Sequence, residues 1–234
     1  MEQRRVVWNE NHKRLTELLS KPSEHENATR LLLAHHASLH SSKLVDEDIF
    51  SFEDSLVEGL EEAAWRLYPM KTPDTKNSIA WHVWHIARIE DMTMNALVTN
   101  GQQVLTSGSW LQDLNVRFAH SGNSMIDDDI AELSAKLDIG ALLAYRYAVG
   151  KQTRRILASL QPGDWTQKVQ ADRIQRLFEE QALLPEASGI GDYWSNKTIA
   201  GLALMPATRH NFVHLNKCDR IKQKLQKTQK KPVR

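Results

Sequence analysis

Residues 78–95, SIAWHVWHIARIEDMTMN, have the apolar spacing of an α-helix and carry a histidine within the apolar face. At about 100° per residue, four apolar side chains fall on the same side as His85: Trp81, Ile89, Met92 and Ala96. A buried imidazole without a partner costs roughly 1–3 kcal/mol, so His85 needs a hydrogen bond or a ligand. The segment therefore predicts a core helix whose apolar face contains one polar, titratable side chain, His85.

The rest of the chain is also patterned for helices, and no segment alternates apolar and polar residues as a half-exposed strand would. We expect further helices over residues 3–19, 24–41, 52–67, 139–160, 170–182 and 195–227. Pro22 separates the first two, because proline cannot continue the helical hydrogen-bond ladder. Long helices with crossover connections predict an all-α four-helix bundle with extra N-terminal and short connecting helices.

Two segments rich in helix-breaking residues, 100–123 and 184–192, are expected to be connections. We expect the first to be a plain crossover, the alternative being a lid over a site. The three aspartates at 127–129 predict a helix N-terminus, because carboxylates favour the positive end of the helix dipole. Pro206 lies within the last predicted helix, which therefore either kinks there or begins anew at the proline.

The length of 234 residues predicts one domain over residues 1–234, with an N-terminal helical extension at 1–23 and a basic, disordered tail at 228–234. Lys+Arg 30 and Asp+Glu 29 give a formal net charge of +1, which argues against nucleic acid as a partner. The C-terminal residues 217–234 are nonetheless strongly basic. We expect a solvated tail there, and the alternative is a tether to nucleic acid or to an anionic membrane.

Cys218 is the one cysteine of the sequence, so no intramolecular disulfide can form, as is typical of a reducing compartment. No apolar run approaches the roughly 18–20 residues needed to span a bilayer. Residues 1–14 lack the apolar core of a signal peptide. These features predict a cytoplasmic protein without a membrane partner.

His210 and His214 stand one helical turn apart in RHNFVHL, so they share a helix face with about 6 Å between them along the axis. Two imidazoles at this spacing can reach one metal ion. His85, on another helix of the bundle, is well placed to supply a third ligand. Three histidines leave a coordination position open for water, as in catalytic zinc sites, and nickel, iron and manganese also suit imidazole.

Each of these residues also has an interpretation without metal. His85 can be a core histidine with a hydrogen-bond partner, and an HxxxH pair is a weak signal in a helical chain with 10 histidines. The same spacing recurs at His36 and His40, with nothing else nearby to indicate a site. Cys218 lies about 12 Å from His210 along the axis, too far to share an ion, and is expected to be a small core residue.

Other polar residues near the predicted ligands have less definite roles. Arg88 and Arg209 could hold a substrate carboxylate, although a solvated or structural arginine is commoner. Glu90 and Asp91 face away from His85 in the helical projection, so neither is assigned as a general base. The tryptophans, 7 in number, are expected mainly in the core.

The segments SIAWHVWHIARIEDMTMN and MPATRHNFVHLNKC together resemble the DinB-like superfamily of metal-binding four-helix bundles. The resemblance is to a bacterial branch that carries a WHIAR.ED element and a late MPA.RHNF.HL element, and it covers roughly residues 52–225. It implies that one histidine of the second bundle helix and an HxxxH pair of the fourth hold the metal, here His85, His210 and His214. Relatives commonly have a further histidine beside the last ligand, where this chain has Val213 and Leu215.

The resemblance also implies a function. Relatives include transferases and isomerases that use mycothiol, bacillithiol or glutathione, and metal-dependent hydrolases. A metal-dependent enzyme of this kind would use a divalent ion (zinc, nickel, iron or manganese) and a small-molecule substrate, and a transferase would also use a low-molecular-weight thiol. Dimers are frequent in the superfamily, which suggests a homodimer. The alternative is a non-catalytic stress or binding protein in which the metal stabilises the bundle.

Overall fold

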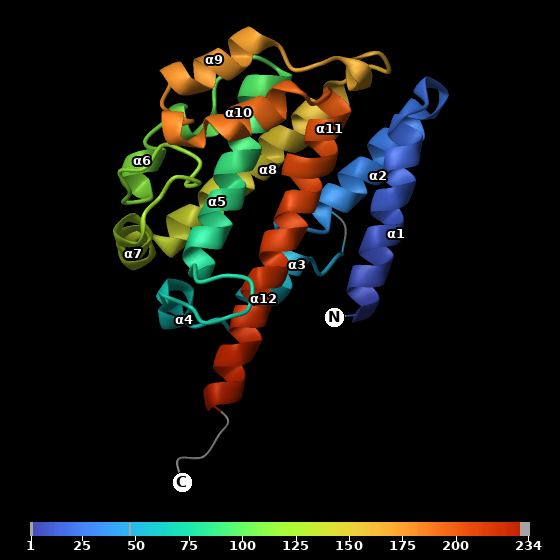
Figure 1. Cartoon of the computed structure of the whole chain (residues 1–234). Helices are drawn as coiled ribbons and strands as arrows, with labels where there is room; N and C mark the ends of the chain where they lie inside the picture. Colours follow the sequence, from blue (N-terminus) through green and yellow to red (C-terminus); the bar gives the residue numbers. More distant parts are fainter. Residues whose placement is uncertain (1, 47, 230–234) are drawn as a thin grey trace.

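The computed structural model describes residues 2–46 and 48–229 (Figure 1). Within this part of the chain, helices and their connections form the whole fold, and the only β pairings are isolated bridges. The predicted all-α fold is therefore confirmed. Among the same residues, no helix combines the length and the apolar character needed to cross a lipid bilayer.

Four long helices form the bundle: α2 (His25–Ala37), α5 (Ile79–Asp91), α8 (Ile139–Ser159) and α12 (His210–Gln229). Helix α5 packs against both α8 and α12, and α2 packs against α8 on the other side (Figure 1). The predicted N-terminal extension is α1 (Glu2–Leu19), which lies along α2. α12 runs to Gln229, so the first part of the predicted tail is helical, and residues 230–234 lie outside the described residues.

Helix α5 begins at Ser78, whose side chain accepts a hydrogen bond from the backbone N–H of Trp81. Every residue from Ile79 to Asp91 is buried, as is the π-helical segment Met92–Val98 that continues the helix. A helix buried on all sides is surrounded by other elements of the protein. Its polar residues must therefore find partners within the protein, whichever face they occupy.

The structure corrects the predicted helix over 52–67, which is instead two short helices, α3 (Phe52–Val57) and α4 (Glu62–Arg66). Between them, Gly59 has a φ of 62°, a left-handed conformation that ends a helix. The predicted connection over 184–192 was also wrong. Most of it is helical, with a 3₁₀ turn at Pro185–Ala187 followed by α10 (Ser188–Ser195).

Pro206 lies inside a π-helical segment and does not begin a new helix. Helix α11 (Ile199–Leu204) passes into a π-helical segment, Met205–Arg209, which leads directly into α12. The wider turn accommodates the residue that lacks a backbone N–H. The helix expected over 195–227 therefore begins later than predicted, at Ile199 after a non-helical break at 196–198, and continues through the π-helical segment into α12.

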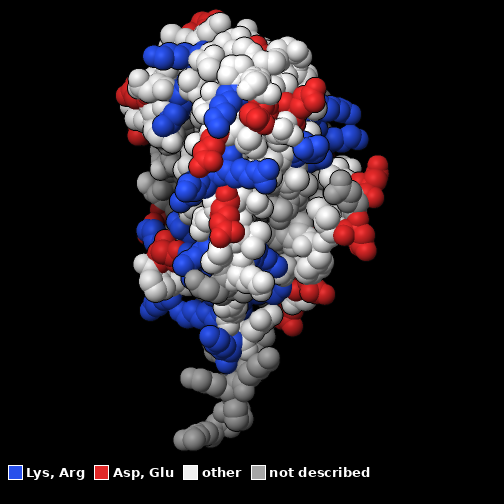
Figure 2. All heavy atoms as spheres, turned by 90° about the vertical axis from the view of Figure 1, so that its right-hand side faces the viewer, with Lys and Arg blue, Asp and Glu red and all other residues white. Residues whose placement is uncertain are grey.

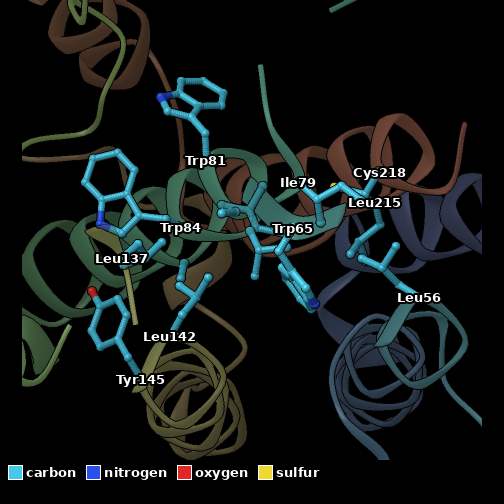
Figure 3. Close-up of a cluster of buried hydrophobic side chains, with 14 of the residues drawn as sticks. Leu56, Trp65, Ile79, Trp81, Trp84, Leu137, Leu142, Tyr145, Leu215 and Cys218 are labelled. Atoms are coloured by element: carbon cyan, nitrogen blue, oxygen red, sulfur yellow. The ribbon is translucent and has the colours of Figure 1, made fainter. Parts of the chain in front are cut away.

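Shorter helices fill the connections: α6 (Trp110–Asp113), α7 (Asp127–Lys136) and α9 (Ala171–Glu179). Helix α7 begins at the predicted aspartate cluster. α6 lies within the long crossover 100–123. Two groups of buried apolar side chains hold the bundle together. Figure 3 shows part of the first, with Trp84 of α5 on the same side as Tyr145 of α8, and Leu215 of α12 on the side of Leu56 of α3.

Charged side chains of both signs cover the face shown in Figure 2, on the side of the molecule where α1 and α2 lie in Figure 1. Lysine and arginine are spread over this face, from its upper end to the end from which the C-terminal residues extend. On this face, the described residues form no continuous positive surface. Of the basic stretch noted in the sequence, residues 217–229 form the C-terminal part of α12.

Candidate metal centre

Three histidines predicted to lie together do so. His85 comes from α5, and His210 and His214 come from the first two turns of α12. Each of these histidines has one ring nitrogen that lies within 4.8 Å of a ring nitrogen of each of the other two. Bonds of about 2.0–2.1 Å to a tetrahedral ion would place such nitrogens about 3.4 Å apart, so small side-chain movements would close the set around an ion.

His85 is held by the long connection. Its Nδ1–H donates to the backbone carbonyl of Ser121 at 2.6 Å, and its ring stacks on Trp81 with the centroids 4.6 Å apart. Because a carbonyl can only accept, the proton must be on Nδ1, which leaves Nε2 unprotonated and able to bind a metal. The crossover 100–123 therefore fixes the orientation of a candidate ligand.

His214 is oriented by another histidine. His214 Nδ1 lies 2.9 Å from Nδ1 of His82, whose Nε2 is in turn 2.9 Å from the hydroxyl of Thr75. When His214 Nδ1–H donates to His82, Nε2 of His214 is left for an ion. The two positions where relatives carry a further histidine do not contribute here, because Val213 is 39 % exposed and Leu215 is buried in the apolar core.

His210 has a buried Nδ1 with no hydrogen-bond partner. A buried nitrogen left unpaired costs roughly 1–3 kcal/mol, unless a ligand occupies its lone pair. His210 is also partly exposed, whereas His85 and His214 are buried, so solvent reaches the cluster from the side of His210.

All three rings are held in the form that binds metal. Burial, with a smaller contribution from Lys217, lowers the pKa of His85 to about 4, even though the hydrogen bond to Ser121 raises it. Burial and the neighbouring histidines lower the pKa of His210 and of His214 well below the usual range. The imidazoles are therefore neutral near pH 7, as metal ligation requires.

Residues 54–185 match the sequence model of the DinB superfamily. This chain belongs to the DinB superfamily. The matched range includes α5 with His85 and ends before α12, so the pair His210 and His214 lies beyond it. No curated protein matches the sequence. DinB superfamily proteins bind metal, and the buried histidines of this member form a group that could hold an ion.

The two arginines considered as substrate anchors are placed differently in this DinB protein. Arg88 is buried, and all five of its N–H groups are used: they donate to Asp91, Tyr145, Gln103 and, twice, to the carbonyl of Ala119. None remains for a substrate. Arg209 is exposed.

Cys218 is a fully buried core residue, as expected, and burial raises the pKa of its thiol. A cysteine in this state is not a nucleophile. The DinB bundle thus holds its cysteine for packing alone.

The structure contains a second group of side chains that could hold a metal ion, which the sequence pattern did not predict as a site. His36, His40 and Glu90 each place one ligand atom within 4.8 Å of the others, and all three are buried. The HxxxH spacing at His36 and His40 was the available signal. Glu90 was set aside because it faces away from His85, and this face of α5 proves to be buried as well.

Proposed function

We propose that this protein is a metal-dependent enzyme of the DinB superfamily, in which His85, His210 and His214 hold one divalent ion that acts on a small molecule. The observation that carries the proposal is the set of three neutral imidazoles with ring nitrogens within 4.8 Å of one another. Two of the three are oriented through their Nδ1 atoms, by the Ser121 carbonyl and by His82, as metal-binding histidines commonly are.

When bound, an ion with three protein ligands keeps a position for water, a thiol or a substrate oxygen, and it acts there as a Lewis acid. The chain's own residues exclude water from most of the site. Trp81 covers the ring of His85, and the partly exposed edge of His210 is the side from which a small molecule can approach.

A thiol-dependent transferase is the reaction class that the resemblance to the superfamily favours, and a hydrolase is the second. The two differ in what occupies the open position: a thiolate sulfur or a water. Saturable binding of glutathione, bacillithiol or mycothiol to the metal-loaded protein, and much weaker binding to the metal-free protein, would identify a transferase. Equal affinity for both forms would rule out the thiol as a ligand of the ion.

Metal content, measured by mass spectrometry on tag-free protein folded with zinc, nickel, iron or manganese, tests the site. We expect the ion at this site, about one per chain, to be lost in the His210→Ala/His214→Ala double variant. Val213→Ala is the matched control, because it lies on the same helix between the two histidines and is 39 % exposed. If the double variant keeps the full complement of ions, the site is wrong.

A structural ion is the alternative, favoured by the burial of His85 and His214. Chelation would then lower the unfolding temperature sharply, whereas an ion needed only for catalysis can be removed with little effect on it.

The proposal also includes one domain over residues 1–234, a cytoplasmic location and a homodimer. Light scattering would test the dimer.

A further inference from the structure

The second group of metal-competent side chains lies between α2 and α5. His36 Nε2 is 2.8 Å from one carboxylate oxygen of Glu90, and His40 Nε2 is 3.1 Å from the other. The two rings stack with their centroids 4.2 Å apart. None of the three side chains is more than 1 % exposed. This is a built cluster of two nitrogen donors and one carboxylate, isolated from solvent.

Glu90 is held by hydrogen-bond donors, because Nε2 of His36 and Nε2 of His40 each face one of its oxygens. Its third neighbour is Asn211, whose amide donates to the carboxylate at 2.9 Å. The nearby guanidinium of Arg146 is already paired with Glu53 at 2.5 Å, and its other nitrogens donate to Asn211 and to the carbonyl of Leu39. These bonds of Arg146 do not reach Glu90, whose carboxylate, when ionised, is a fully buried negative charge. Such a charge is costly unless a cation balances it.

The histidines also carry unused nitrogens. Nδ1 of His36 and Nδ1 of His40 are buried without a hydrogen-bond partner. A neutral ring that donates Nε2–H to Glu90 leaves its Nδ1 unprotonated, and that lone pair can bind a cation. Unprotonated nitrogen and ionised carboxylate are the forms that ligate metal.

The neighbouring helix is shaped to admit the ring of His40. A Cβ atom added at Gly150 of α8 would lie 2.7 Å from Nδ1 of His40, closer than such atoms approach. A glycine at this position therefore lets α8 close over the cluster.

We propose that His36, His40 and Glu90 form a second divalent-metal site, separate from that of His85, His210 and His214. Two histidines and one carboxylate suit iron, manganese or zinc. The ion balances the charge of Glu90, and Asn211 orients the carboxylate that binds it. It joins α2 to α5 and is enclosed, so its role is structural. An enclosed ion enters as the chain folds, and a chelator removes it from the folded protein slowly.

The test is metal content of protein refolded separately with iron(II), manganese, cobalt or zinc, with the ions located in crystals by anomalous scattering. The His210→Ala/His214→Ala variant isolates the second site, so failure of the proposed catalytic centre does not affect the result. We expect that variant to keep about one ion per chain, and Glu90→Gln introduced into it to remove that ion. Glu90→Gln preserves the shape of the side chain and removes its charge.

His35→Gln is the matched control for His36→Gln, because both residues are buried and adjacent on α2, and only His36 contacts Glu90. The control should keep the ion and His36→Gln should lose it. If Glu90→Gln does not fold, the visible absorption spectrum of cobalt bound to the His210→Ala/His214→Ala variant tests which side chains bind the ion. Two nitrogens and a carboxylate give a different cobalt spectrum from three nitrogens. The proposal is overturned if that variant binds no ion with any of these metals, or if anomalous density places the ion elsewhere.

Discussion

The Nδ1 atoms of His82 and His214 lie 2.9 Å apart, which joins the flank of α5 to the last candidate ligand on α12. His82 is itself anchored by the hydroxyl of Thr75. A candidate ligand that is oriented by a second residue has lower metal affinity when that residue is lost, commonly by 10–100-fold.

We therefore expect His82→Ala to weaken metal binding by roughly 10–100-fold while the fold persists. A titration against a chelator of known affinity measures this, and circular dichroism checks the fold. His25→Ala serves as the control, because His25 is partly exposed and lies outside both clusters of candidate ligands. Unchanged affinity in the His82 variant would show that His214 is oriented without it.

The stability of the metal-free protein should depend on pH below about 6.5. Burial lowers the pKa of His40 and His82 to about 3 and that of His85 to about 4 in the folded protein. The unfolded chain therefore binds more protons than the folded one between about pH 6.5 and pH 4, and the free energy of unfolding falls as the pH falls. Each such histidine contributes a slope of about 1.4 kcal/mol per pH unit in this window, and none above it.

Urea unfolding of chelated protein across this range is the measurement. The midpoint should be nearly constant from about pH 7 to pH 8 and should decrease steadily toward pH 4. A midpoint that stays constant down to about pH 5 would contradict the lowered pKa values.

Arg88 should matter for stability and not for substrate binding. Its guanidinium is 1 % exposed and forms a buried ion pair with Asp91 at 2.9 Å. Arg88→Met leaves that carboxylate without its cation, so we expect a loss of about 3–5 kcal/mol in the free energy of unfolding. Chemical denaturation measures it. Arg209→Ala, at an exposed position, should change the same quantity by less than about 0.5 kcal/mol. Near-wild-type stability of Arg88→Met would mean that the ion pair contributes little.

Gly150→Ala should destabilise the protein, because its Cβ would be 2.7 Å from Nδ1 of His40 and 2.9 Å from Cδ1 of Leu44. Overpacking of this kind costs about 1–3 kcal/mol, despite the better helix propensity of alanine. Gly189→Ala is the control, since nothing lies within 4 Å of the position of its Cβ. Equal changes of the melting temperature in the two variants would show that a glycine at position 150 is not needed for close packing against His40.

The helical periodicity of the sequence was enough to bring His85, His210 and His214 together, because an apolar face with one histidine must meet a partner. It could not identify Glu90. A helical projection separates the two sides of a helix but does not say whether the far side meets water. Helix α5 is buried on every side, so facing away from His85 means facing His36 and His40 on α2.

The errors in helix boundaries also have local causes. Apolar residues continue at helical spacing across Gly59, and the positive φ at that glycine became visible only in the structure. Gly189 and Gly191 predicted a loop, whereas tertiary packing keeps them in α10. A Cβ at Gly191 would lie 3.1 Å from the ring of Phe178, so the glycine lets α10 approach α9.

The π-helical segment Met205–Arg209 comes immediately before His210, and each residue of a helix advances by about 100° around its axis. Deleting one residue from this segment would turn the following helix by about that angle relative to α11. His210 and His214 would then leave the face that looks toward His85 together, although neither was altered. The number of residues before α12 therefore positions the candidate ligands as much as the identity of the histidines does.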